Sequence, residues 1–304
     1  MMPTAVPVSS SRIRLISIML FACAAFGAEP THAAITHRIA AFLEQAAGPL
    51  AESAAPQAPT DNDESSLPTG ADVLDRFVEA TGGREAYASV QNRVLTGTLE
   101  FVGMGIQSKV QSWQVAPNKF YTLRNTEGLG PVEEGCDGEV VWSSSLTQGP
   151  EVARGALRAF KLRSFRFNAD CHWRELYDHV VCTGTETVAQ IECYKVIKYP
   201  VEGYPETAYY ALKSGLLVGT ELTVPTPMGD IPTQSFYSNY RRVGDLLVPF
   251  REVIRTMGRE QRMDYDAIVY DGEIPQGCFD LPQDIRALVE RYRAQAEADG
   301  REGL

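Results

Sequence analysis

The chain has 304 residues, of which 44% are hydrophobic, and these values are typical of a globular protein with one large domain or two small ones. The formal net charge of -11 argues against nucleic-acid binding, because contact with a phosphate backbone needs basic patches and none appears in the sequence. Only four histidines are present, which limits acid–base and metal chemistry near neutral pH.

The first 27 residues have the pattern of an export signal. Two arginines precede an apolar run over Leu15–Phe26 that is short for a membrane-spanning helix, and Ala25-x-Gly27 is a small-residue cleavage pattern. Leu20–Cys23 approaches a lipobox, so simple secretion and acylation of Cys23 both stay open. The sequence therefore predicts an exported, periplasmic protein that associates with a membrane only if Cys23 is acylated.

Residues 28–69 are predicted to lie outside the folded core. Ile35–Glu52 has helical content, which Gly48-Pro49 interrupts. Ala54–Gly70 is rich in Pro, Ser, Asp and Ala and has almost no bulky apolar side chain, so it cannot bury enough surface to order itself. We expect a variable helix and a linker here.

A helix is predicted to open the folded unit near residue 70, because Val73, Leu74, Phe77 and Val78 recur at helical spacing before Gly82-Gly83. Alternating apolar and polar residues and turn signals then predict strands. These are Arg93–Phe101, Lys109–Val115, Asn118–Asn125, Val132–Gly135, Glu139–Ser143, His179–Gly184, Glu192–Tyr199 and Gln261–Tyr270. Helical segments are expected at Pro150–Phe167 and Asp170–Asp178.

The stretch Pro205–Arg255 is predicted to form four consecutive strands. Turn signals separate them at Lys213–Gly215, Pro225–Asp230 and Val243–Asp245. Strands joined by such short turns are antiparallel neighbours, because a parallel crossover needs a dozen or more residues. A meander of a large antiparallel sheet follows.

The order of elements predicts an α+β fold with one dominant sheet of eleven or so strands. A sheet of this width curls into a closed or partly open barrel, or splits in two. A charged helix over Gln283–Ala298 and a tail are expected after it, so that residues 283–304 follow the folded unit.

Nine short motifs resemble the LolA-like outer-membrane lipoprotein-sorting proteins, and more closely their exported relatives without assigned cargo. They are Asp75–Gly83, Ala116–Phe120, Gly135–Trp142, Trp173–Tyr177, Cys193–Val196, Ser214–Val218, Thr226–Pro232, Val248–Phe250 and Phe279–Pro282. The resemblance covers residues 70–282. It implies a LolA/LolB-like half-barrel: a large curved antiparallel β-sheet forming an incomplete β-barrel, covered on its concave face by short helices, with room for acyl chains.

Bulky apolar residues on the predicted strands are candidates to line such a cavity, where each buried methylene of an alkyl chain gains roughly 0.8 kcal/mol. They are Trp113, Phe120, Trp142, Tyr209, Leu216, Val218, Leu222, Phe236, Phe250 and Ile254. The alternative is that they fill an ordinary core.

Motifs for chemistry are few. A continuous helix would place His172, Glu175 and His179 on one face as metal ligands, although capping or surface roles fit them as well. Asp264 and Asp266 share a strand face as a carboxylate pair or as part of a solvated sheet face. The sequence has no nucleophile elbow, no phosphate-binding glycine loop and no Cys-x-x-Cys, so no cofactor is predicted.

Five cysteines follow the signal, so an oxidising compartment would leave at least one thiol unpaired. Cys182 and Cys193 are at nearly equal distances from the turn expected at Val188, which makes them a candidate disulfide across a hairpin or two small buried residues.

Taken together, the sequence predicts a non-enzymatic periplasmic or envelope carrier or sensor of a lipid, lipoprotein acyl chains or another apolar ligand. Its partners would be that ligand and envelope proteins, and not nucleic acid. Two alternatives stay open: an envelope assembly module that uses an open sheet edge, and a metal-dependent enzyme built on His172, Glu175 and His179.

Overall fold

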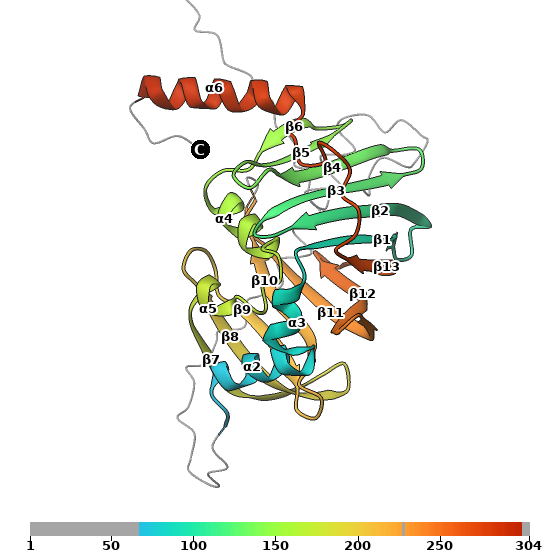
Figure 1. Ribbon diagram of the computed structural model, residues 1–304, viewed down its shortest axis with the longest axis vertical. Coiled ribbons are helices and arrows are strands. Elements are labelled where there is room, and N and C mark those ends of the chain that lie inside the picture. The colour runs from blue at the N-terminus through green and yellow to red at the C-terminus, as the bar shows by residue number, and fades with distance from the viewer. Residues whose placement is uncertain (1–66, 227–228, 300–304) are drawn as a thin grey trace, which may run out of the picture. The chain divides into compact units, whose positions relative to one another are not determined.

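The computed structural model describes residues 67–226 and 229–299, and its main feature is one antiparallel sheet of 13 strands (Figure 1). The strands are β1 (Asn92–Phe101), β2 (Ile106–Val115), β3 (Lys119–Thr126), β4 (Gly130–Cys136), β5 (Val141–Ser145), β6 (Gly149–Val152), β7 (Tyr177–Val188), β8 (Ile191–Pro200), β9 (Glu206–Ala211), β10 (Leu217–Val224), β11 (Ile231–Val243), β12 (Leu246–Thr256) and β13 (Arg259–Tyr270). Their order is β6-β5-β4-β3-β2-β1-β13-β12-β11-β10-β9-β8-β7. Because β6 and β7 are edge strands that do not pair with each other, the sheet is open and does not close into a barrel.

Five helices accompany the sheet in the described part of the chain: α2 (Gly70–Ala80), α3 (Gly83–Ser89), α4 (Gly155–Ser164), α5 (Trp173–Leu176) and α6 (Gln283–Asp299). The α2 helix begins where the sequence predicts it. Thr69 caps it, since the Thr69 hydroxyl accepts from the Asp72 amide at 3.1 Å and the Asp72 carboxylate accepts from the Thr69 amide at 3.0 Å. Gly82, with φ of 138°, lets the chain turn directly into α3.

The two faces of the sheet carry different helices. On the concave face, α2 and α3 place Val78 and Tyr87 against Leu95, Phe250 and Ile268. The α4 region covers the same face further along, where Leu162 and Phe165 pack on Phe120, Cys136 and Val141. The C-terminal α6 helix packs instead on the opposite face, with Ile285 and Val289 against Val140 and Trp142.

Bulges change which residues point to each face. The register of β10 shifts between Leu217 and Gly219, so that Leu217 packs near Tyr210 on the concave face while Val218 packs with Tyr209 on the opposite face. Similar shifts occur in β1 between Thr96 and Gly97 and in β7 between Cys182 and Gly184.

The predicted α+β class with a large open antiparallel sheet is confirmed, and two helix predictions need correction. The segment expected to be helical over Pro150–Phe167 begins as strand β6, which pairs with β5, and becomes helix only at Gly155. Of Asp170–Asp178, only four residues form α5, because β7 begins at Tyr177 and pairs with β8. In both places sheet pairing outweighs the local helical pattern.

The export signal, Cys23 and the linker up to residue 66 lie outside the described residues. Within the described part, each helix is too short or too polar to cross a membrane.

The cysteines of the described residues are all free thiols, so the candidate Cys182–Cys193 disulfide is wrong in this structure. The β7–β8 turn is centred on Ala189 and Gln190, both with positive φ, rather than on Val188. Cys182 therefore pairs with Val196 on the concave face, while Cys193 pairs with Glu186 and faces the other way.

Candidate functional site

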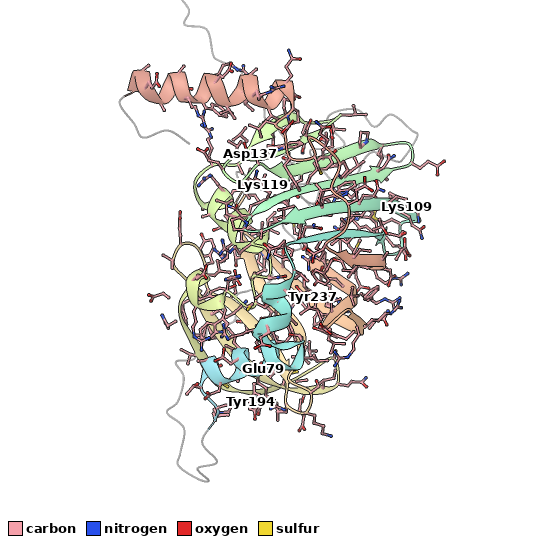
Figure 2. The ribbon with its side chains drawn as sticks, in the orientation of Figure 1. Glu79, Lys109, Lys119, Asp137, Tyr194 and Tyr237 are labelled. Carbon is pink, nitrogen blue, oxygen red and sulfur yellow. The ribbon has the colours of Figure 1, made fainter. Side chains whose placement is uncertain are left out.

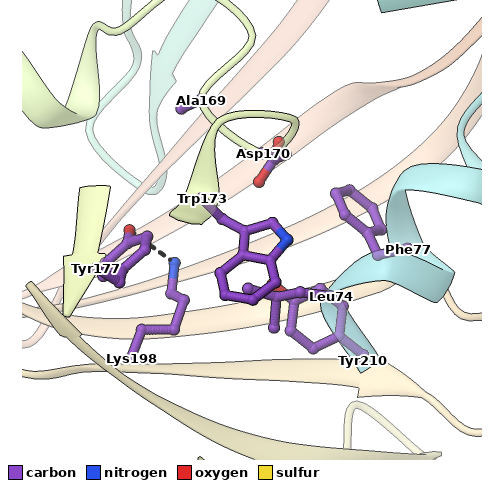
Figure 3. Close-up of a pocket in the computed structure, with 8 residues that line it drawn as sticks. All are labelled: Leu74, Phe77, Ala169, Asp170, Trp173, Tyr177, Lys198 and Tyr210. Atoms are coloured by element: carbon purple, nitrogen blue, oxygen red, sulfur yellow. Dashed lines mark hydrogen bonds between the residues drawn. The ribbon is translucent and has the colours of Figure 1, made fainter. Parts of the chain in front are cut away.

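A pocket lies between the concave face and helices α2 and α5 (Figure 3). Its lining residues come from α2, the segment leading into α5, and strands β7 to β9: Leu74, Phe77, Ala169, Asp170, Trp173, Tyr177, Lys198 and Tyr210. The space inside is about 20 Å³, which is room for about one water molecule. In this arrangement the pocket is closed to a larger ligand.

Four of the eight residues that line the pocket are aromatic. Trp173 is 6% exposed, and its indole lies in the middle of the pocket in Figure 3. Phe77 of α2 meets Tyr210 of β9 with ring centroids 5.4 Å apart and the planes tilted by 56°. Helix α2 therefore contacts the sheet through an apolar and aromatic surface, which a hydrocarbon chain could replace.

A buried ion-pair network lies beside the aromatic wall. The Glu206 carboxylate accepts from Arg163 Nε at 2.9 Å and from the Tyr177 hydroxyl at 2.7 Å. The Lys198 ammonium is 3.2 Å from the same carboxylate and donates to the Tyr177 hydroxyl at 3.0 Å. One acidic group thus holds two cations, and about a tenth of each of these charged side chains is exposed.

Mutual attraction keeps these groups charged. Burial acts to raise the pKa of Glu206, but the charges of Lys198 and Arg163 outweigh it and hold that pKa below its ordinary value. Burial acts to lower the pKa of Lys198, and its interactions with Tyr177 and Glu206 place that pKa well above the ordinary value. The pocket therefore has one permanently cationic side chain in its wall.

Helices α2 and α5 are joined to each other by exposed contacts. The Asp75 carboxylate of α2 accepts two hydrogen bonds from the Arg174 guanidinium, at 2.8 and 2.6 Å, and one from the Trp173 indole at 3.3 Å. Arg84 of α3 donates to it at 2.9 Å. Arg174 lowers the pKa of Asp75 most strongly among its neighbours, so the contact is ionic at neutral pH.

The concave face beyond the pocket is also polar. Glu252, Tyr237 and Tyr265 lie deep in the fold, where burial raises the pKa of each, and yet each keeps some contact with solvent. Tyr237 is among the side chains labelled in Figure 2. An ordinary apolar core does not contain such polar groups, so this part of the concave face suits a ligand with both polar and apolar parts.

The ten predicted cavity residues are divided between the two faces. Strand register places Phe120, Leu222, Phe250 and Ile254 on the concave face. Trp113, Trp142, Tyr209, Val218 and Phe236 lie on the opposite face, and Leu216 lies in the turn before β10. None of the ten lines the pocket described above.

The five residues on the opposite face have contacts of their own. Tyr121 lies between Trp113 and Trp142, with ring centroids 5.8 and 6.1 Å away. Phe236 lies under the Arg255 guanidinium, whose carbon is 4.9 Å from the ring centroid. A cavity role on the concave face stays a prediction for Phe120, Leu222, Phe250 and Ile254.

The proposed metal ligands do not converge. His172 lies next to Glu175, with His172 Nδ1 2.9 Å from the carboxylate, but His179 lies on β7 and stacks on Tyr199. The chain leaves the helix before residue 179, so the spacing that a continuous helix would give is lost. Within the described ranges, no group of three or more His, Cys, Asp or Glu side chains is placed to hold a metal ion.

The two aspartates of β13 also have separate surroundings. Asp264 forms ion pairs with Arg251 at 2.5 Å and with Arg262 at 3.0 Å, and Asp266 is an exposed residue next to the β1–β13 bulge. The sequence left open a carboxylate pair or a solvated sheet face, and these separate surroundings agree with the solvated sheet face.

Sequence reasoning missed the residues that line the pocket. Phe77 and Trp173 belong to motifs that carried the family resemblance, and Leu74 directly precedes one of them, but their helical context indicated only packed helices. Lys198 and Glu206 had a usable signal: each is a charged residue at a concave-face position of a strand, where the alternation calls for an apolar one.

Comparisons with known proteins locate the fold. No family model matches the sequence, and neither does any curated protein. Among solved structures, a LolA superfamily protein from Nitrosomonas europaea is 12% identical, with 71% of this chain and 99% of that chain covered at a TM-score of 0.50. A DUF1329 family protein from Desulfovibrio piger is 11% identical, with 69% and 97% covered at a TM-score of 0.49. A putative outer membrane lipoprotein-sorting protein domain from Vibrio parahaemolyticus is 9% identical, with 69% and 96% covered at a TM-score of 0.47.

The fold defines a class of protein: an open antiparallel half-barrel with short helices over its concave face. More particularly, the chain has the LolA-like fold, as the sequence motifs predicted.

Proposed function

We propose that the protein is a non-enzymatic carrier or sensor that holds a lipid, a lipoprotein acyl chain or another apolar ligand between the concave face and helices α2 and α5, outside the cytoplasm. The observation that carries the proposal is the aromatic pocket around Trp173, which lies under the helices that cover the half-barrel. The LolA-like fold supports it.

Loading requires α2 and α5 to move, because the closed pocket has room for about one water molecule. Separating two or three buried side chains such as Leu74 and Phe77 from the sheet costs roughly 1.5–3 kcal/mol each. A chain of about ten methylenes regains roughly 8 kcal/mol on burial. Long acyl chains can therefore replace the helix contacts, whereas short ones cannot.

Quenching of tryptophan fluorescence by brominated fatty acids tests the proposal. In a W113F/W142F variant, the remaining Trp173 reports on the pocket, whereas in W173F the remaining tryptophans report on the opposite face. We expect a brominated sixteen-carbon chain to quench the first variant and to leave the second nearly unchanged. A six-carbon analogue should quench neither.

Equal quenching of both variants would contradict binding under the helices. Absence of quenching, together with no lipid in native mass spectra of the purified protein, would contradict the carrier function. That second result would favour the assembly-module alternative, which would use the free edge of β7, where Val181 is 42% exposed.

A further inference from the structure

A second feature of the concave face is the cation Arg124 on β3. It pairs across the sheet with Val110 and Val132, which places it on the same face as Phe120. Arg124 is only partly exposed, and Glu134 on the neighbouring strand is held by Lys161 of α4. Burial alone lowers its pKa. A partly desolvated guanidinium is costly until an anion pairs with it, and a bound ligand supplies such an anion.

Paired hydroxyl groups flank Arg124 on both sides. Ser108 and Thr126 are 2.6 Å apart, Ser112 and Thr122 are 2.8 Å apart, and all four lie on the concave face. In each pair one hydroxyl donates to the other, so the accepting hydroxyl still has its own proton to donate. Arg124 therefore lies among hydroxyl donors.

A second cation comes from α4. The Lys161 ammonium, 7% exposed as a residue, forms an ion pair with Glu134. Burial and the nearby charge of Arg124 act to lower the pKa of Lys161, and the Glu134 carboxylate acts in the opposite direction. Glu151 lies further along the same face, on β6. This end of the concave face therefore holds a guanidinium and an ammonium close to each other.

We propose that Arg124, with its flanking hydroxyls and Lys161, binds the phosphate group of an amphiphilic ligand whose acyl chain lies under the covering helices. This inference rests on the proposed carrier function and names the polar part of its ligand. A guanidinium presents two parallel N–H donors to a phosphate, and the hydroxyls supply donors for its remaining oxygens. A carboxylate, with two oxygens, would leave several of these donors unused.

The test compares two ligands with the same chain: lysophosphatidic acid and the matching monoacylglycerol, which lacks the phosphate. Binding is measured by calorimetry for the wild-type protein, R124Q, R124K and K109Q. Lys109 lies one position from Arg124's partner Val110 but on the opposite face, near the rim of the sheet (Figure 2), so K109Q removes the same charge from the wrong side. We expect wild type and K109Q to prefer the phosphate ligand by about tenfold or more, R124Q to lose the preference, and R124K to keep part of it.

The outcomes separate this inference from the carrier function. If neither ligand binds, the carrier function fails. If both bind equally to wild type, or R124Q keeps the preference, the phosphate site fails while the carrier function stands. Inorganic phosphate is the third probe: Arg124-dependent binding of phosphate alone, with no preference between the two lipids, would support an anion site and overturn its assignment to a lipid headgroup.

Thermal unfolding of R124Q without ligand gives an independent check. Because the proposal assigns Arg124 to the ligand and not to the fold, its removal should leave the unfolding temperature unchanged or raise it. A decrease of several degrees would identify Arg124 as a structural residue and overturn the proposal.

Discussion

At the scale of single residues, Glu206 is the charge on which the wall of the pocket depends. Its carboxylate contacts Arg163, Lys198 and Tyr177, and all of these side chains are largely buried. If the carboxylate is removed, two cations are left in a medium of low dielectric without a counter-ion. Leaving these two cations unpaired costs more free energy than the ion pairs contribute to stability.

Replacing Glu206 by Gln should therefore lower the free energy of unfolding by about 3–5 kcal/mol at pH 7. The matched control is Glu186→Gln, because Glu186 forms an ion pair with Lys195 at 3.0 Å in which both side chains are well exposed. Exposed pairs contribute less than about 1 kcal/mol, so that variant should remain near the wild type. Urea unfolding measures both, and equal losses in the two variants would contradict the argument.

The same carboxylate predicts a pH dependence. Because the pKa of Glu206 is lower in the folded state than the ordinary value of 4.5, its contribution is fully present above about pH 5 and is lost as pH falls through the folded-state pKa. The difference in unfolding free energy between wild type and E206Q should shrink over that range.

The experiment should follow the difference in unfolding free energy between wild type and E206Q, because Glu252 changes the stability of each protein with pH in the opposite direction. Burial raises the pKa of Glu252, so protonation below neutral pH favours the folded state at that position. Both proteins contain Glu252, and its effect cancels in the comparison. A difference that stays constant from pH 7 to pH 3 would show that Glu206 does not titrate as the geometry requires.

At the scale of elements, α2 and α5 are tied to each other more loosely than α2 is tied to the sheet. The Asp75–Arg174 pair joins side chains that are 39% and 52% exposed, where screening keeps it below about 1 kcal/mol, and the Trp173 indole adds one hydrogen bond to Asp75 at 3.3 Å. The Phe77 contact with Tyr210 is buried. Opening the helices therefore depends mainly on apolar contacts, with Asp75 as a small additional restraint.

Replacing Asp75 by Ala should speed the entry of ligand and leave stability nearly unchanged. Loss of a restraint below about 1 kcal/mol corresponds to at most about a fivefold faster association. Stopped-flow quenching of Trp173 by a brominated acyl chain measures the rate. Glu79→Ala removes the same charge from the same helix, where Glu79 has no ion pair within the described residues, and should leave the rate unchanged (Figure 2). A slower D75A variant would contradict the lid role of α2 and α5.

Local patterns predicted most of these elements because strand alternation and turn residues are short-range signals. The strand predicted at Arg93–Phe101 is β1 within one residue, and the helix predicted at residue 70 begins there with its Thr69 cap. The cavity residues could not be chosen in the same way. Alternation says that Val218 and Leu222 share a face, but the β10 bulge reverses this at Val218, and such a bulge is specified by pairing with a distant strand.

At the scale of the whole sheet, the pairing of β1 with β13 joins two meanders, one running from β1 to β6 and the other from β7 to β13. The junction contains the bulge at Thr96 and Gly97, where the backbones come close. A Cβ on Gly97 would lie 2.5 Å from the Asp264 carbonyl oxygen and 2.6 Å from the Met263 methyl carbon. Only glycine fits there without movement of the strands.

Replacing Gly97 by Ala should lower the free energy of unfolding by about 1–3 kcal/mol, because the added methyl group has no space beside a backbone carbonyl. Thr98→Ala is the matched control on the next position, which faces the opposite side and pairs with Asp264. It should cost less than about 1 kcal/mol. Denaturant unfolding checks both values, and a neutral G97A variant would show that the junction tolerates separation of its strands.

The overall topology was less accessible to sequence reasoning than its parts. The antiparallel meanders follow from short turns such as Lys213–Gly215. The β1–β13 pairing brings together Arg93 and Tyr270, and no local signal specifies such a contact. The resemblance to LolA-like proteins implied only an incomplete barrel, and the structure confirms a large open antiparallel sheet.

The β1–β13 junction also sets the order in which the molecule can be completed. A chain that emerges from its N-terminus presents β1 early, yet the strand that covers its free edge ends at Tyr270. The backbone amides and carbonyls on this edge of β1 therefore stay unpaired until about 170 further residues have been added to the chain. A chaperone that covers the unpaired edge of β1 during that interval would protect the unfinished chain from aggregation. Within the first meander, β1 is the strand that needs this protection most.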